Sequence, residues 1–95
     1  MFAVKVEYIV FPEYEGENRN RIQEFLKAFE DLDNSRFRYT VFQDRESKRF
    51  IHLSEYKDEE IQKMLLSNPI FLKFQEQRDK NLKEAPSITW LDCVL

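Results

Sequence analysis

Hydrophobic and polar residues alternate along four segments of the chain, at residues 2–11, 37–43, 49–56 and 87–95. In the first segment Val4, Val6, Tyr8 and Val10 occupy every second position. Successive side chains of a β-strand point to opposite faces, so a period of two is typical of a strand with one buried face. The pattern therefore predicts four strands.

Apolar residues spaced three and four positions apart predict a helix between the first two strands. The stripe consists of Ile22, Phe25, Leu26, Phe29 and Leu32. One apolar face at this spacing is typical of a helix that packs on a core. We expect Asn18 to cap this helix, residues 33–35 to end it, and the acidic segment 12–18, which holds the only glycine, to form a loop.

A second helical region follows the third strand and is interrupted once. Acidic residues 58–60 favour a helix start, where they complement the positive end of the helix dipole. Asn68 as a cap and Pro69 as a first residue predict a restart. Residues 85–86, Ala-Pro, are expected to end the region before the last strand. The side chains predicted to face inward are Ile61, Met64, Leu65, Ile70, Phe71, Phe74 and Leu82.

The element order β-α-β-β-α-β predicts a single α+β domain over residues 1–95. This order is typical of a ferredoxin-like sandwich, in which a four-stranded antiparallel sheet carries both helices on one face. Apolar residues occur on both faces of the strands, and a sheet buried on both sides requires this. We therefore expect a second copy to cover the free face and form a homodimeric α+β barrel. The residues concerned are Ile9, Phe42, Ile51 and Leu53 on one face and Val10, Val41 and Phe50 on the other.

Composition narrows the possible partners. Aromatic residues make up 15% of the chain and include nine Phe, a large supply for so small a core, so part of this surface is expected to meet a partner subunit or a ligand. Positive and negative charges are interspersed and sum to −3, which argues against nucleic-acid binding. Cys93 is the only cysteine, and no apolar run reaches membrane-spanning length. We expect a cytoplasmic protein without a membrane partner.

Two adjoining segments carry a family resemblance. They are residues 55–61, Glu-Tyr-Lys-Asp-Glu-Glu-Ile, and residues 65–74, Leu-Leu-Ser-Asn-Pro-Ile-Phe-Leu-Lys-Phe. They resemble the third strand and the broken second helix of the antibiotic biosynthesis monooxygenase-like proteins, which are dimeric α+β barrels. The resemblance implies the fold, a homodimer, and cofactor-independent oxygenation or isomerisation of a small aromatic or quinone-like compound.

The chain departs from this family at several functional positions. Many quinol-oxygenase members carry two histidines on the second helix, at positions occupied here by Leu65 and Ile70. Haem-degrading members combine an Asn on the first strand with a Trp and a His on the second helical region. Here the only Trp is Trp90 and the only His is His52, both on predicted strands. The resemblance therefore does not carry haem chemistry over to this chain.

Two residues are candidates for catalysis. His52 is the only side chain whose ordinary pKa lies near neutrality, which suits a proton shuttle if it lines a cavity. The alternative is a hydrogen-bonded or half-exposed structural histidine. Glu55 matches the family strand position and could be a base, although an ion pair with Arg38 or Arg49 would explain it equally.

Four aromatic residues are candidates for ligand binding. Tyr8, Tyr39 and Tyr56 could present phenol donors to a flat carbonyl or phenolic ligand, and Trp90 could stack on it. The alternative for each is packing in the core or a dimer interface. With a single glycine and no metal-ligand spacing, we expect neither a nucleotide cofactor nor a metal site.

Three classes of function share this architecture. The first is a cofactor-independent enzyme whose substrate anion itself reduces oxygen, so that the protein supplies a base and donors for the oxyanion. The second is a non-catalytic ligand-binding or protein-interaction module that kept the fold. The third, an RNA-recognition motif, requires glycine and basic residues around the aromatic residues of the third strand, and residues 48–56 lack that glycine and end in Glu-Tyr.

Overall fold

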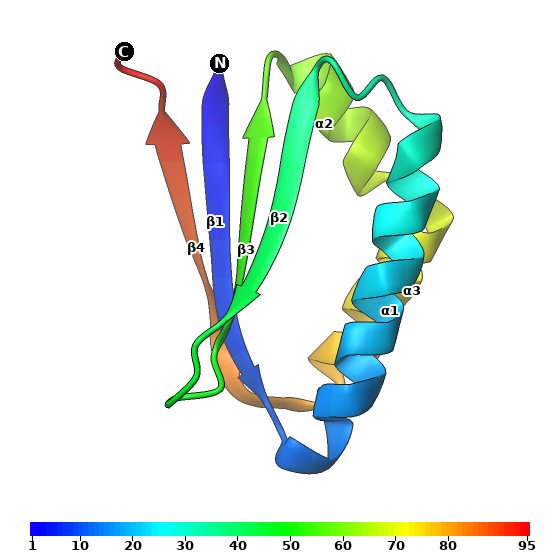
Figure 1. The fold of residues 1–95 in the computed structure, drawn as a ribbon, viewed down its shortest axis with the longest axis vertical. Coiled ribbons are helices and arrows are strands. Elements are labelled where there is room, and N and C mark those ends of the chain that lie inside the picture. Colours follow the sequence, from blue (N-terminus) through cyan, green and yellow to red (C-terminus); the bar gives the residue numbers. More distant parts are fainter.

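A computed structural model describes residues 1–95 as a four-stranded antiparallel sheet whose one face is covered by three helices (Figure 1). The sheet has the order β2-β3-β1-β4, and every neighbouring pair is antiparallel. The predicted ferredoxin-like α+β fold is confirmed. The strands are β1 (Phe2–Val10), β2 (Phe37–Gln43), β3 (Phe50–Tyr56) and β4 (Leu82–Asp92). The helices are α1 (Glu15–Ala28), α2 (Glu59–Leu66) and α3 (Pro69–Asp79).

The core lies between the sheet and the helices. On β3 every second residue from Phe50 to Tyr56 is buried, and the residues between them are half-buried on the outer face. Three helical phenylalanines, Phe25, Phe29 and Phe74, lie at most 2% exposed against this face. The pleat of the strands thus sorts the side chains into a core face and an outer face.

The acidic segment 12–18 is helical, in contrast to the predicted loop. Pro12 opens a 3-10 turn, Pro12–Tyr14, and α1 follows directly at Glu15. A proline suits a helix start because it lacks an N–H that would be unpaired there, and acidic residues suit the positive end of the helix dipole. Asn18 is therefore not a cap: it lies one turn inside α1 and is fully buried.

The predicted break between α2 and α3 is confirmed by two capping side chains. Asp58 accepts a hydrogen bond from the Ile61 amide at 2.9 Å, and Asn68 accepts one from the Ile70 amide at 2.9 Å. Each bond satisfies an amide that has no partner within its helix. Pro69 occupies the first turn of α3, as expected.

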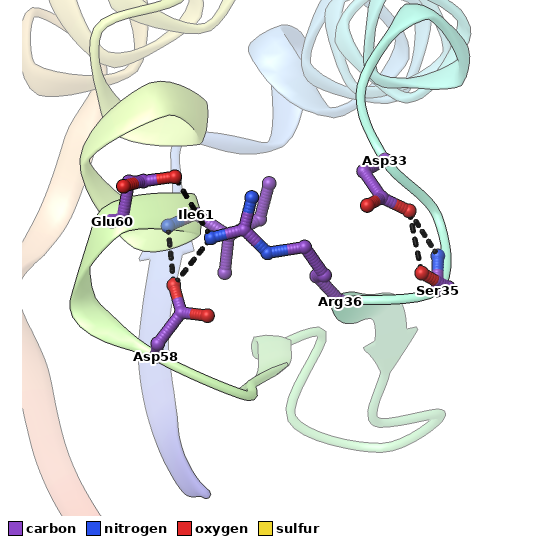
Figure 2. A network of polar contacts seen from close by, with 6 residues as sticks. All are labelled: Asp33, Ser35, Arg36, Asp58, Glu60 and Ile61. Carbon is purple, nitrogen blue, oxygen red and sulfur yellow. Dashed lines mark hydrogen bonds and ion pairs between the residues drawn. The ribbon is translucent and has the colours of Figure 1, made fainter.

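Arg36 directly precedes β2 and links the beginning of this strand to the beginning of α2 (Figure 2). Its guanidinium lies 2.8 Å from a carboxylate oxygen of Asp58 and 3.1 Å from one of Glu60. The Ile61 amide and then the Arg36 guanidinium hold the pKa of Asp58 below its ordinary value. Asp58 thus serves both as the helix cap and as an ion-pair partner across the fold.

The last strand begins earlier than predicted, because α3 ends at Asp79 and β4 starts at Leu82. Pro86 therefore lies inside a strand. This is tolerated because β4 is an edge strand and its register with β1 shifts between the pairs Glu7–Ser87 and Ile9–Glu84, which leaves residues 85–86 outside the regular pairing.

Two residues expected to face inward are exposed. Met64 is 46% and Ile70 43% exposed. The break at Asn68 starts a new helix, so the buried positions of α3 do not continue the spacing of those on α2, and each short helix buries only a narrow stripe. The buried stripes are Ile61 and Leu65 on α2, and Phe71, Phe74 and Arg78 on α3. No helix is long and apolar enough to cross a membrane.

Candidate functional site

Three side chains from three strands form a hydrogen-bonded chain inside the core. The hydroxyl of Tyr8 on β1 lies 2.7 Å from Nε2 of His52 on β3. The hydroxyl of Tyr39 on β2 lies 2.7 Å from Nδ1 of the same ring. Both nitrogens of the buried imidazole therefore have a phenolic partner.

Strand register brings these residues together. In the ladders His52 lies opposite Val6 of β1 and Val41 of β2. Tyr8 and Tyr39 are each two residues from those positions, on the same face of the sheet. Such diagonal neighbours lie within reach of aromatic side chains, so each tyrosine reaches across to one edge of the ring.

Asn18 sets the direction of this chain. Its Nδ2 donates to the Tyr8 hydroxyl at 3.0 Å, and its Oδ1 is buried without a partner. The reversed amide would bury unpaired N–H groups instead, which costs more than an unpaired carbonyl. Tyr8, which is fully buried, must then donate its own proton to Nε2 of His52, the one acceptor within its reach.

The tautomer of His52 follows from that direction. With Nε2 accepting from Tyr8, the ring proton resides on Nδ1 and is donated to the Tyr39 oxygen. Tyr39 makes no other hydrogen bond within the protein, so its own hydroxyl proton remains free. The chain of hydrogen bonds therefore runs from Asn18 through Tyr8 and His52 to Tyr39, whose hydroxyl is a free donor.

All side chains in this hydrogen-bonded network are neutral at physiological pH. Burial, together with the nearby positive charge of Arg78, lowers the pKa of His52 to about 3. Burial raises the pKa of Tyr8 and that of Tyr39. His52 therefore orients two phenols at neutral pH, whereas the predicted shuttle role requires a pKa much nearer to 7.

A cavity of about 250 Å³ lies between the sheet and helices α2 and α3. Four of the predicted site residues line it: Tyr39, His52, Tyr56 and Trp90. Trp90 is 64% exposed and lies on edge strand β4, so one flat aromatic surface borders the cavity on its solvent side. The size and lining suit a small flat molecule.

Two predicted site residues do not line this cavity. Tyr8 is fully buried and contacts the cavity-lining residues His52 and Arg78 without lining the cavity itself. Glu55 is three residues from His52 on the same strand, so it points to the outer face and lies opposite Arg38 of β2. The structure therefore does not bring Glu55 to His52, and strand alternation is the reason.

Sequence reasoning missed Arg78, the charged residue of the site. Its side chain is only 10% exposed, and its guanidinium carbon lies 5.0 Å from the centre of the Tyr8 ring and 5.4 Å from that of Phe74. Nε and Nη2 both donate to one carboxylate oxygen of Asp79, at 3.2 and 3.0 Å. Arg78 continues the spacing of Phe71 and Phe74, so a charge on an apolar stripe was the available signal.

Clusters of ionisable ligands are absent elsewhere. No group of three or more His, Cys, Asp or Glu side chains lies close enough to hold a metal ion. Cys93 is a free, exposed cysteine just beyond the end of β4.

Comparison with known proteins supports the fold. No family model and no curated protein matches the chain. The solved structure of an antibiotic biosynthesis monooxygenase superposes with a TM-score of 0.85 at 14% identity, over 100% of both chains. A Mycobacterium tuberculosis protein superposes with a TM-score of 0.85 at 15% identity, over 99% of this chain and 95% of that chain.

A Caulobacter crescentus protein provisionally named as an antibiotic biosynthesis monooxygenase gives a TM-score of 0.86 at 17% identity, over 99% of this chain and 90% of that chain. The predicted resemblance is thus confirmed: this chain has the fold of the antibiotic biosynthesis monooxygenase-like proteins. At these identities the likeness is one of fold.

The buried neutral histidine predicts a loss of stability in mild acid. Between pH 6.5 and about 3 the unfolded chain binds a proton at His52 that the folded chain does not. The free energy of unfolding should therefore fall with decreasing pH across this window, by about 1.4 kcal/mol per pH unit. Urea unfolding at pH 7, 6 and 5 measures this slope.

The control is His52→Gln, which keeps a donor and an acceptor but does not titrate. Its free energy of unfolding should change little between pH 7 and 5, because ordinary carboxylates titrate at lower pH. A wild-type protein equally stable at pH 7 and pH 5 would contradict the burial of a neutral His52.

Proposed function

We propose that this protein is a cofactor-independent monooxygenase or isomerase that acts on a small aromatic or quinone-like compound in the cavity. The observation that carries this proposal is Tyr39, which lines the cavity and whose hydroxyl oxygen is hydrogen-bonded to Nδ1 of His52. A donor held in place before the reaction stabilises an oxyanion without reorganisation. The neighbouring solved structures named as monooxygenases support the same chemistry.

The reaction needs a stabilised substrate anion. In oxygenation, the ring carbon next to the oxyanion shares its negative charge, gives electrons to O₂ and forms a C–O bond to a peroxide anion. The peroxide anion takes up a proton from solvent, and the resulting hydroperoxide loses water together with the hydrogen of that carbon, which leaves a carbonyl group. In isomerisation, the same anion takes up its proton at another carbon. In both cases Tyr39 donates to the ligand oxygen on which negative charge develops, and Tyr56 and Trp90 flank the ring.

A second candidate is a non-catalytic ligand-binding module in the same cavity. The observation that favours it is the state of the ionisable groups. His52 is neutral with both nitrogens occupied, and no Asp or Glu lines the cavity, so no side chain there is poised to accept a proton at neutral pH. Binding without turnover would support this second candidate.

We also propose that the protein is a cytoplasmic homodimer joined through the outer face of the sheet. Several apolar residues lie half-buried or exposed on that face of the isolated chain, and burial against a second sheet would remove them from water. Phe42 on β2 is 55% exposed. The others are Ile9, Ile51, Leu53 and Leu91.

Substitution of Tyr39 by Phe tests the oxyanion donor. A screen of quinols and small phenols by oxygen consumption first identifies a substrate of the wild-type protein. With that substrate, Tyr39→Phe should lower kcat about 100-fold, the usual effect of removing one oxyanion donor, and change KM much less. The matched control is Tyr14→Phe, because the buried Tyr14 hydroxyl has no partner and does not line the cavity.

Two results would decide against the proposal. Unchanged kcat in Tyr39→Phe would remove Tyr39 from the mechanism. Phenols that bind in the cavity without oxygen consumption or isomerisation would favour the binding module.

Light scattering tests the dimer. The wild-type protein should have twice the mass of the 11.6 kDa chain. Phe42→Asp places a charge in the proposed interface and should shift the protein to the monomer. Leu72→Asp, at a 49% exposed position on α3, should leave the dimer intact. A monomeric wild-type protein at micromolar concentration, or a dimeric Phe42→Asp variant, would contradict the interface.

A further inference from the structure

Arg78 is the one charged side chain among the residues that line the cavity. We propose that the cavity binds its aromatic ligand as an anion, with Arg78 as the counter-charge. The inference rests on the proposed function in so far as both place a small aromatic ligand in this cavity. It goes further because it names the ligand class: acidic phenols, enols or carboxylates rather than neutral aromatics.

The first argument is the uneven pairing of Arg78. A buried charge is costly unless it is paired. The Arg78 side chain is 10% exposed, whereas its partner Asp79 is 55% exposed and therefore strongly solvated. Water weakens the attraction between Arg78 and the exposed Asp79 more than it would weaken the attraction between Arg78 and an anion held inside the cavity. The guanidinium thus retains attraction for a second, better shielded anion.

The second argument is the unused donor capacity of the guanidinium. Nε and Nη2 donate to Asp79, and Nη1 has no partner within the protein. Nη1 is not completely buried. An Nη1 without a protein partner, on a residue that lines the cavity, can donate to an anionic oxygen of a ligand.

The third argument is the charge balance of the cavity. Its other polar lining groups are neutral: His52, Ser54, Tyr39, Tyr56, Gln62 and Gln75. The positive charge of Arg78 already lowers the pKa of His52, which shows that its field reaches the centre of the site. A bound phenol should feel the same field and lose its proton more readily.

This arrangement removes the need for a protein base. A phenol with a lowered pKa releases its proton to solvent as it binds, and the phenolate remains between the Tyr39 donor and the Arg78 charge. The neutral His52 is then no obstacle to anion chemistry. A purely structural Arg78, fixed by its stacking on Tyr8 and Phe74, would leave the pKa of a bound phenol unchanged or raised by burial.

The probe is 4-nitrophenol, whose absorbance distinguishes phenol from phenolate. Titrating the wild-type protein into 4-nitrophenol over a range of pH gives the pKa of the bound ligand. We expect this pKa to lie at least about one unit below that of free 4-nitrophenol, equivalent to phenolate binding about tenfold tighter than phenol. Its methyl ether, 4-nitroanisole, cannot ionise and serves as the uncharged analogue.

Four variants separate the charge of Arg78 from its packing. Arg78→Gln should abolish the shift while 4-nitroanisole binding changes little, and Arg78→Lys should keep part of it. Asp79→Asn, an exposed change, should enlarge the shift because Arg78 loses its competing partner. Lys73→Gln removes an exposed charge from the same helix and should have no effect.

A bound pKa equal to or above that of free 4-nitrophenol would overturn the inference, as would failure of 4-nitrophenol to bind. If Arg78→Gln does not fold, as judged by circular dichroism, Asp79→Asn still decides: an unchanged shift would overturn the role of Arg78. The readout needs no turnover. A lowered ligand pKa, together with neither oxygenation nor isomerisation of any quinol or phenol in the screen, would keep the anion site and reject the proposed catalysis.

Discussion

The site depends on one constraint, the need of a buried imidazole for a partner at each ring nitrogen. His52 lies among aromatic rings, with centroids 5.2 Å from Tyr8 and 5.5 Å from Phe74, and only 2% of the residue is exposed. An unpaired ring nitrogen there would cost about 1–3 kcal/mol. Tyr8 and Tyr39 meet this need from the two neighbouring strands, and in doing so they fix the ring, its tautomer and the position of the Tyr39 hydroxyl.

The same constraint separates the chemistry of the site into two parts. The hydrogen-bonded chain is neutral and ends in a donor, whereas the charge is supplied by Arg78 from α3. A donor and a cation together stabilise a ligand anion, but neither accepts a proton. Both proposals for this cavity, the reaction and the ligand class, follow from this division between a neutral hydrogen-bonded network on the sheet and one positively charged side chain on α3.

Most of the fold could be predicted from local patterns. The bounds of β2 and β3 and the restart of the helix at Asn68 follow from alternation and capping within a few residues. The errors occur where a distant contact overrides the local signal. Asn18 resembles a cap but is buried inside α1, because its amide completes the bond to Tyr8. Pro86 resembles a helix end but lies in an edge strand at a register shift.

The site was less predictable than the fold, because it depends on register and on side-chain direction. Side-chain chemistry on the predicted strands selected His52, Tyr39, Tyr56 and Trp90, which line the cavity, but also Tyr8, which does not. The sequence could have shown that Glu55 and His52 lie on opposite faces of the sheet, because residues three positions apart on a strand point to opposite faces. Arg78 could not be placed without knowing where α3 lies on the sheet. The direction of the hydrogen bonds could not be predicted without knowing that Tyr8 is buried and how the Asn18 amide is oriented.

The most direct test of this account is the protonation state of His52, measured by ¹⁵N NMR of its ring nitrogens in the unliganded protein. We expect a neutral ring with the proton on Nδ1 and a bare Nε2, unchanged between pH 7 and pH 5. A ring protonated on both nitrogens in that range, or a proton on Nε2 instead, would contradict the direction of the chain and the donor role of Tyr39.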